Sequence, residues 1–211
     1  MPNNRYLVLL DMDSTFIQQE VIDLLASHAN VGDEVARITE LSMRGEIDFK
    51  ESLTRRVSLL KGLPESIFEV VRNQISLSTG AREMVAGLHR QGDVVAIISG
   101  GFENVIAPLL VREEIDYFRA NVLEIIDGHL TGRTVGDVID RSAKAEFLKE
   151  LSQRLEIPLE KTIAVGDGAN DLGMMEIAGT SVAFNAKPIV RENADISITD
   201  GDLRRILELT K

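Results

Sequence analysis

The chain has 211 residues, and its 34 acidic side chains outnumber its 23 Lys and Arg, for a net charge of −11. This charge argues against broad binding to nucleic acids or anionic membranes, because such binding depends on basic side chains that neutralise phosphates. The chain contains no cysteine, which excludes disulfides, thiolate catalysis and Cys-based zinc sites. We therefore expect a cytoplasmic protein with no nucleic-acid or membrane partner, either a monomer or a homodimer.

The first predicted elements are one strand and a group of helices. The apolar run Tyr6–Leu10 is too short for a signal or membrane segment and predicts a buried strand that ends at Asp11. Residues 18–75 then carry apolar side chains at the spacing of one helix face, four times in succession. The fourth helix is expected to start near Pro64, a good first-turn residue. The pattern predicts a small helical bundle.

From residue 80 onward, predicted strands and helices alternate. The predicted order is a helix over 80–90, a strand over 94–98, a helix after Ser99-Gly100-Gly101, a hairpin around Asp127-Gly128, a helix over 142–155, a strand over 162–165, a helix over 170–178, strands near 182 and 196, and a helix over 202–209. Continuous apolar strands separated by helices are typical of a parallel sheet covered on both faces.

This pattern predicts an α/β protein with two parts. Residues 1–16 and 77–211 are expected to form a Rossmann-like core, with a parallel sheet and helices on both faces. Residues 17–76 are expected to form a helical-bundle cap, inserted after the first strand. Because ligands of open parallel sheets bind beyond the carboxyl ends of the strands, the residues at those ends are the candidates for a site.

Two acids follow the first predicted strand, in Asp11-Met12-Asp13. A carboxylate can attack phosphorus and form an acyl phosphate, and a second carboxylic acid can protonate the leaving alkoxide and later take a proton from water. Asp11 and Asp13 suit these two roles. Alone the pair is a weak signal, since two acids in a turn are usually solvated or cap a helix.

The segment Gly166-Asp167-Gly168-Ala169-Asn170-Asp171 adds two acids at another strand end. Mg²⁺ prefers oxygen ligands and usually takes one or two carboxylates. Asp11 and Asp167 are the expected ligands, and Asp171 is expected to orient them through hydrogen bonds. The alternative is that both acids of this segment cap the following helix.

Ser99, Gly100 and Lys144 are the candidate phosphate-binding residues. The Ser99 hydroxyl and the Gly100 amide are expected at a helix N-terminus, where donors point at phosphate oxygens, and Lys144 supplies a positive charge. Taken singly, Ser99 reads as a helix cap and Lys144 as a solvated lysine. Their expected position beside the acids favours the functional interpretation.

Four segments, in this order, resemble the motifs of the haloacid-dehalogenase superfamily of phosphotransferases: LVLLDMDST, VVAIISGGF, the Lys144 of RSAKAEFL, and VGDGANDLGMM. Within that superfamily the chain is similar to the branch that acts on O-phosphoserine, and the similarity covers essentially the whole chain. It rests on Glu20 in STFIQQEVID and on LSMRGEIDFKESLTRRVSLLKGL, NVLEIIDGHLTG and GTSVAFNAKPIVRENAD.

The resemblance implies hydrolysis of O-phospho-L-serine through an aspartyl-phosphate on Asp11, the last step of serine biosynthesis. It implies that Mg²⁺ is held by Asp11, Asp167 and the main-chain carbonyl of Asp13. It also implies that Glu20 meets the substrate ammonium and Arg56 its carboxylate. Residues expected to line the closed pocket are Met43, Phe49 and Asn170.

Three alternatives remain open at this stage. The same core could act on another small phosphorylated metabolite, or transfer the phosphoryl group to an alcohol. A signalling receiver domain also combines a parallel sheet with acids and a lysine, although the second acid and the helical insert argue against it. A catalytically silent binding protein fits poorly, because every catalytic position is filled. Regulation through a preceding N-terminal domain, which some relatives carry, is not expected.

Overall fold

The protein, described over residues 5–211 in a computed structural model, is built around a seven-stranded sheet with strand order β4-β3-β2-β1-β5-β6-β7. Neighbouring strands are parallel except for the antiparallel pair β3 and β4. The strands are β1 (Leu7–Asp11), β2 (Val94–Phe102), β3 (Tyr117–Ile126), β4 (His129–Val135), β5 (Thr162–Gly166), β6 (Thr180–Phe184) and β7 (Ile196–Ile198).

Strand β1 lies in the middle of this sheet and is buried on both faces. Val8 and Leu10 belong to the hydrophobic cluster on one face, while Leu7 and Leu9 belong to the cluster on the other. All four side chains are fully buried. An unbroken apolar run is what a strand covered on both faces requires, so the sequence places β1 at the centre of the core.

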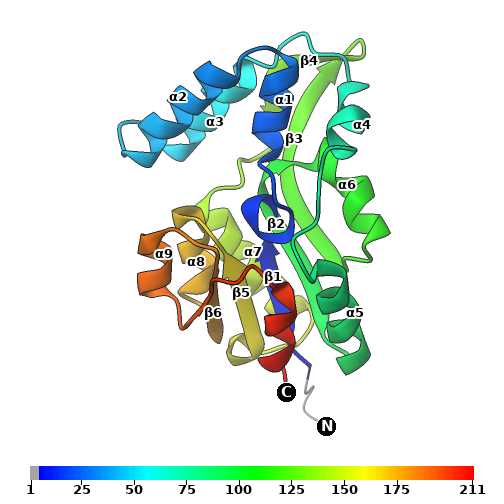
Figure 1. Ribbon diagram of the computed structural model, residues 1–211, viewed down its shortest axis with the longest axis vertical. Helices are drawn as coiled ribbons and strands as arrows, with labels where there is room; N and C mark the ends of the chain where they lie inside the picture. The colour runs from blue at the N-terminus through cyan, green and yellow to red at the C-terminus, as the bar shows by residue number, and fades with distance from the viewer. Residues whose placement is uncertain (1–4) are drawn as a thin grey trace.

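Helices cover both faces of the sheet (Figure 1). Buried side chains of α5 and α6 join the cluster around Val8, and those of α7, α8 and α9 join the cluster around Leu7. This confirms the predicted Rossmann-like arrangement. Within residues 5–211, no helix has both the length and the hydropathy to span a bilayer. These helices are α5 (Ala81–Gln91), α6 (Glu103–Arg112), α7 (Arg141–Arg154), α8 (Leu172–Met175) and α9 (Pro188–Asn193).

Three elements of this core differ from the prediction. The helix expected over 170–178 is a 3₁₀ turn, Ala169–Asp171, followed by the short α8. The terminal helix is a 3₁₀ helix, Leu203–Glu208. Helix α9 was not predicted, although Pro188 occupies its first turn, where a missing N–H costs nothing.

The four predicted helices of the insert are confirmed, and they lie together at one end of the molecule (Figure 1). Two linkers join them to the core side by side. Gln18 N–H donates to the Ser76 carbonyl at 2.9 Å, and Ser78 N–H donates to the Phe16 carbonyl at 3.0 Å. The boundary near 16 and 77 stays a prediction, and residues 1–4 of the expected core lie outside the described residues. The helices are α1 (Val21–His28), α2 (Gly32–Met43), α3 (Phe49–Ser58) and α4 (Ile67–Arg72).

A third connection joins cap and core through the β3–β4 hairpin. Gly62 N–H donates to the Leu130 carbonyl at 2.8 Å, and Leu130 N–H donates to the Leu63 carbonyl at 2.8 Å. Glu65 N–H donates to the Gly128 carbonyl at 2.9 Å. The hairpin, which the sequence assigned to the core, therefore pairs at its tip with the chain between α3 and α4.

Gly132 lets this hairpin approach α3 closely. Its φ is +83°, and a Cβ there would lie 3.0 Å from the Lys61 Cβ and 3.1 Å from the Ser58 carbonyl oxygen. Gly128 in the hairpin turn has a similar φ of +73°, but a Cβ there would meet nothing within 4 Å. The two glycines therefore differ in the space around them rather than in backbone strain.

We predict that Gly132→Ala destabilises the protein more than Gly128→Ala does. Both variants incur the cost of a left-handed alanine, but only the first also forces the hairpin away from α3, for an additional loss of about 1–2 kcal/mol. Urea unfolding of both variants measures the difference. Equal losses would show that the hairpin does not depend on this contact.

Candidate active site

The first two acids lie where the chain leaves β1. The strand ends at Asp11, and the following turn, Met12–Phe16, contains Ser14 with a left-handed φ of +56°. The pairing of β1 therefore stops before Asp13, although Asp13 keeps an extended backbone with φ −69° and ψ 137°. Instead Asp13 lies against the end of β2, because a Cβ on Gly101 would come within 2.8 Å of the Asp13 Oδ2. Because glycine has no Cβ, position 101 leaves room for this carboxylate.

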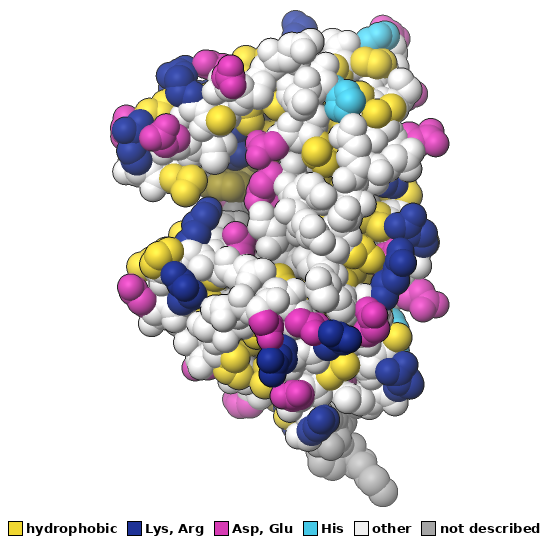
Figure 2. All heavy atoms as spheres, in the orientation of Figure 1, with side chains coloured by type: hydrophobic (Ala, Val, Ile, Leu, Met, Phe, Trp, Pro, Cys, Tyr) yellow, Lys and Arg dark blue, Asp and Glu magenta, His cyan; other side chains and the backbone are white. Residues whose placement is uncertain are grey.

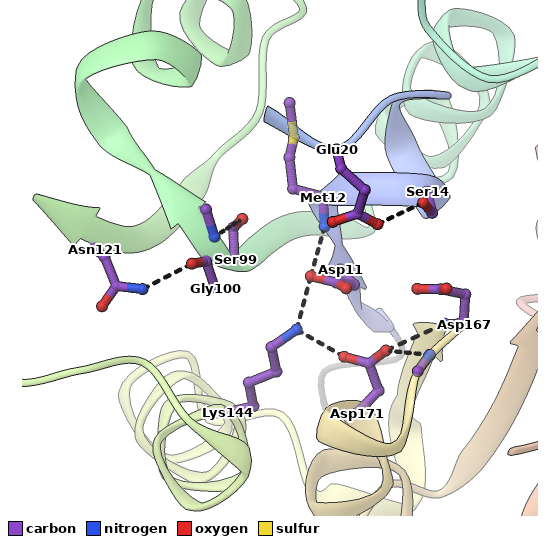
Figure 3. A network of polar contacts seen from close by, with 12 residues as sticks. Asp11, Met12, Ser14, Glu20, Ser99, Gly100, Asn121, Lys144, Asp167 and Asp171 are labelled. Atoms are coloured by element: carbon purple, nitrogen blue, oxygen red, sulfur yellow. Dashed lines mark hydrogen bonds and ion pairs between the residues drawn. The ribbon is translucent and has the colours of Figure 1, made fainter. Parts of the chain in front are cut away.

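A buried lysine connects Asp11 with Asp171 (Figure 3). Lys144 Nζ donates to Oδ1 of each acid at 2.7 Å, and the lysine has no exposed surface. Asp11 Oδ1 also accepts the Met12 N–H at 2.8 Å, which leaves Oδ2 as the freer oxygen. Since an ammonium has three donors, one N–H of Lys144 remains for a ligand. Lys144 is thus a buried charge rather than a solvated one.

Asp171 organises the loop that carries Asp167. Its Oδ2 accepts the N–H of Asp167 at 3.1 Å and that of Gly168 at 3.0 Å. A side chain at Gly166 would collide with the Asp171 carboxylate, so glycine is required there. The charge-assisted bonds hold the loop in one conformation beside Asp11.

Asp11, Asp167 and Asp171 each offer a carboxylate oxygen within 4.8 Å of the others. Burial, followed by the charges of Asp171 and Glu20, raises the pKa of Asp167 to about 7. Burial and then Asp171 raise the pKa of Asp11 well above its usual range, against the opposite influence of Lys144. One lysine does not offset this negative charge, so the residues present fit a hard divalent cation such as Mg²⁺.

Lys144 keeps its proton in this setting. Burial alone would lower its pKa, but the charges of Asp11 and Asp171 and their hydrogen bonds outweigh that effect, and the net shift is upward. The lysine is therefore a permanent positive charge at the site.

Asp13 has the surroundings of a proton donor. Burial, then the charges of Glu20 and Asp11, raise its pKa well above the usual range. Its Oδ1 is buried and has no hydrogen-bond partner among residues 5–211. A carboxyl group with a raised pKa and a free oxygen suits general acid catalysis.

Ser99 and Gly100 lie near the end of β2 rather than at a helix N-terminus as expected, while the helix predicted after Ser99-Gly100-Gly101 is confirmed as α6. Strand β2 continues to Phe102, and α6 starts at Glu103. Ser99 is fully buried, and its Oγ accepts the Gly101 N–H at 2.8 Å, so its own proton remains available to a ligand. The donors therefore come from a strand end rather than from a helix terminus.

Glu20 and Arg56 lie on the cap side of the acids. Glu20 Oε1 accepts the Ser14 Oγ–H at 2.6 Å, which ties the start of α1 to the turn after β1 (Figure 3). Arg56, on α3, donates to the Ser52 carbonyl and to Thr39 Oγ, both at 3.4 Å. Burial lowers the Arg56 pKa, and the nearby carboxylates, Glu20 foremost, act in the opposite direction. Glu20 and Arg56 thus place opposite charges near one another.

Of the three predicted pocket residues, Phe49 reaches the core. A Cβ on Gly100 would lie 3.2 Å from the Phe49 Cζ, so this ring covers the Ser99–Gly101 segment from the cap. Asn170 is half-buried beside Gly168. Met43 ends α2 and is 63% exposed. The pocket roles of Met43 and Asn170 stay predictions.

An open cleft separates the cap helices α2 and α3 from the core (Figure 2), and acidic side chains are visible at its inner end. A cavity of about 670 Å³ lies between the start of α3, the start of α7 and the segment 173–177 at the C-terminal side of α8. Phe49 lines it from the cap side and Arg141 from the core side, whereas the catalytic acids lie outside it. The cleft gives a small molecule access to the space under the cap.

Sequence reasoning missed two residues of this network, Ser14 and Asn121 (Figure 3). Ser14 holds Glu20, as described above. Asn121 is 2% exposed, and its Nδ2 donates to the Gly100 carbonyl at 2.8 Å. Asn is depleted in strands, so a single Asn at the start of the apolar run NVLEII was a signal that could have identified it.

One family model and two curated relatives match most of this chain. Residues 8–176 match the haloacid dehalogenase-like hydrolase family. The chain is 49% identical over 203 residues to a phosphoserine phosphatase of Streptococcus thermophilus, covering 96% of this chain and 94% of that one. It is 48% identical to a phosphoserine phosphatase of Streptomyces coelicolor, but spans only 50% of that protein's length.

A solved structure shares the fold over the full length. It is described as the phospho-aspartyl intermediate analogue of phosphoserine phosphatase, and it superposes with a TM-score of 0.93 at 44% identity. The superposition covers 99% of this chain and 100% of that one. Both parts of the molecule, core and cap, therefore have a counterpart in that structure.

We predict that the metal-free protein loses stability between about pH 5 and pH 8, and that Asp167 is one source of the loss. The fold raises the Asp167 pKa from 3.8 to about 7. Its contribution is therefore present below the unfolded pKa and is lost as the pH rises through the folded one. Asp167→Asn should reduce the loss by about 1–2 kcal/mol, allowing for solvent screening.

Thermal unfolding in chelator at the two pH values measures this effect. Added Mg²⁺ should stabilise the wild-type protein more at the higher pH, where Asp167 is ionised, and the Asp167→Asn variant much less. An unchanged pH dependence in the variant would contradict the assignment.

Proposed function

Since the chain belongs to the haloacid dehalogenase-like hydrolases, we propose that it is a magnesium-dependent phosphatase that hydrolyses O-phospho-L-serine to L-serine and phosphate. The observation that carries the chemistry is the buried Asp11–Lys144–Asp171 cluster with a protonatable Asp13 beside it. The substrate follows from the relatives named above. This activity is the last step of serine biosynthesis, and we place it in the cytoplasm, with no nucleic-acid or membrane partner.

In the first step, an Asp11 carboxylate oxygen attacks phosphorus and forms a new O–P bond. The bond between phosphorus and the serine oxygen breaks. Asp11 is positioned for this attack because the Lys144 and Met12 bonds to Oδ1 fix its orientation. The remaining N–H of Lys144, the Ser99 hydroxyl and the Gly100 amide then meet the phosphoryl oxygens, on which negative charge develops.

Asp13 moves the protons. Its carboxyl group gives a proton to the serine oxygen as that bond breaks, and the resulting carboxylate takes a proton from the water that attacks the aspartyl-phosphate. The second step releases phosphate and regenerates the Asp11 carboxylate. The raised pKa of Asp13 supports this assignment, because the group must start protonated.

Asp11, Asp167 and the main-chain carbonyl of Asp13 would hold Mg²⁺, and Asp171 would orient Asp167 through its loop. When bound, the ion supplies positive charge that offsets the phosphate dianion near these acids. The raised pKa values of Asp11 and Asp167 support a cation here, since burial leaves their negative charges uncompensated.

The cap recognises the amino-acid end of the substrate. Glu20 binds the ammonium and Arg56 the carboxylate, for which a planar guanidinium offers two parallel donors. Phe49 covers the phosphate end from the cap, while Met43 and Asn170 complete the pocket when the cap closes. Closure excludes bulk water during the first step.

A signalling receiver was the alternative from a different class, and membership of the hydrolase family rules it out.

Two related activities are separated from the proposed one by assay: hydrolysis of another phosphorylated metabolite, and transfer of the phosphoryl group to an alcohol. Phosphate release from L-phosphoserine should exceed release from phosphothreonine, phosphoethanolamine and a sugar phosphate, and a chelator should abolish it. Asp11→Asn, which cannot form the acyl phosphate, should be inactive on all four. Metal-dependent activity that peaks on another compound would reject the substrate and retain the chemistry.

Arg56→Ala tests recognition of the carboxylate. It should lower kcat/KM for phosphoserine about 10²-fold, the order of magnitude of a lost charge-assisted pair, and leave a generic aryl phosphate nearly unaffected. Arg55→Ala is the matched control, because Arg55 is exposed and pairs with Glu51 on the outer side of the same helix. Equal losses on both substrates would remove Arg56 from its assigned role.

A further inference from the structure

Asn121 lies at the point where two parts of the sheet meet. It pairs with Phe102 as the last register position between β3 and β2, and the next residue, Val122, pairs with β4. The register between β2 and β3 shifts between Ser99 and Phe102. The asparagine therefore stands beside the irregular end of β2 that carries Ser99 and Gly100.

Its side chain joins two backbone segments. Asn121 Nδ2 donates to the Gly100 carbonyl at 2.8 Å, and Asn121 Oδ1 accepts the Ile139 N–H at 2.9 Å. The residue is 2% exposed, so water does not replace these bonds without rearrangement. One neighbour is an acceptor and the other a donor, so a single orientation of the amide satisfies both.

The first bond completes the support of one peptide group. The peptide between Gly100 and Gly101 has its carbonyl held by Asn121, and its N–H donates to the Ser99 Oγ at 2.8 Å. Both ends of this flat unit are fixed, and with it the backbone on either side of Gly100. Glycine itself imposes few limits on φ and ψ, so such external support is needed.

The second bond reaches the helix that carries Lys144. Ile139 directly precedes Asp140, whose side chain caps α7 by accepting the Ala143 N–H at 2.9 Å. Lys144 N–H in turn donates to the Asp140 carbonyl at 3.1 Å. The asparagine thus holds the segment from which the first turn of α7, and Lys144 with it, begins.

We propose that Asn121 is a positioning residue for phosphate. It does not touch the substrate; it holds the end of β2 and the start of α7 at a fixed separation, so that the Gly100 amide and the Lys144 ammonium converge on one phosphoryl group. This inference rests on the phosphate-binding role proposed above for those two residues. Asparagine suits the position because it offers a donor and an acceptor at once, which neither leucine nor a carboxylate does.

Asn104 provides a matched control. Its amide also joins the same strand by two bonds: Nδ2 donates to the Leu123 carbonyl at 3.3 Å, and Oδ1 accepts the Leu123 N–H at 2.8 Å. These bonds reach neither Gly100 nor Ile139. Replacing either asparagine by aspartate keeps size and one acceptor and removes the donor, so the two variants lose similar bonds at different places.

The test measures binding of inorganic phosphate to the full chain in the presence of Mg²⁺, by calorimetry. Asn121→Asp should bind phosphate about tenfold more weakly, as expected for the loss of roughly one hydrogen bond's contribution. Asn104→Asp should bind it as the wild-type protein does. Binding of L-serine, the proposed product that lacks the phosphate, should be the same in both variants as in the wild-type protein, whereas general loss of structure would weaken it too.

Unchanged phosphate affinity in Asn121→Asp, or an equal loss in Asn104→Asp, would overturn the proposal. If Asn121→Asp does not fold, as judged by circular dichroism, Asn121→Ala takes its place: it removes both bonds of the side chain, including the one to the Gly100 carbonyl, without adding a charge, and is held to the same expectation. Failure of the wild-type protein to bind phosphate would reject both proposals. Hydrolysis of an aryl phosphate but not of phosphoserine would reject only the proposed substrate. The role of Asn121 would stand, because it is tested by the dissociation constant for inorganic phosphate.

Discussion

The site depends on one buried ammonium group. Lys144 has no exposed surface, and a buried charge without partners would cost several kcal/mol. Its two partners, Asp11 and Asp171, come from the end of β1 and from the loop after β5. The ion pairs therefore require three separate segments to meet at one edge of the sheet. Correct assembly of the core and assembly of the site are the same event.

The cluster nevertheless remains negatively charged. Asp11, Asp167 and Asp171 bring three carboxylates together, and the one lysine pairs with only two of them, Asp11 and Asp171. Burial, followed by the charge of Asp171, raises the pKa of both Asp11 and Asp167. A divalent cation would offset the charge of a phosphate dianion, so we expect this acidic site to bind an anionic substrate together with a metal.

Strand β3 links the chemistry to the cap. Near its middle, Asn121 holds the Gly100 carbonyl at the end of β2, and beyond it the strand continues into the hairpin whose tip pairs with residues 62–65 of the cap. The cap is thus held by two linkers and by this hairpin. Any movement that opens or closes the cleft must be accommodated by the hairpin, close to the segment that carries Ser99 and Gly100.

The sequence by itself determined the class of fold and indicated which residues gather at the candidate site. Apolar runs and helical spacing mark the elements, and the carboxyl ends of parallel strands necessarily meet, so Asp11, Ser99 and Asp167 were placed correctly at one edge. The local pattern gave the wrong secondary structure where strand pairing determines it. Ser99-Gly100 resembles a helix cap, but pairing with β3 extends β2 through this segment. Only the tertiary structure decided that Lys144 is buried against an acid 133 positions away, that Asn121 supports Gly100, and that Phe49 reaches across from the cap. Such contacts depend on how distant segments pack, and the spacing of residues along the chain carries no record of that.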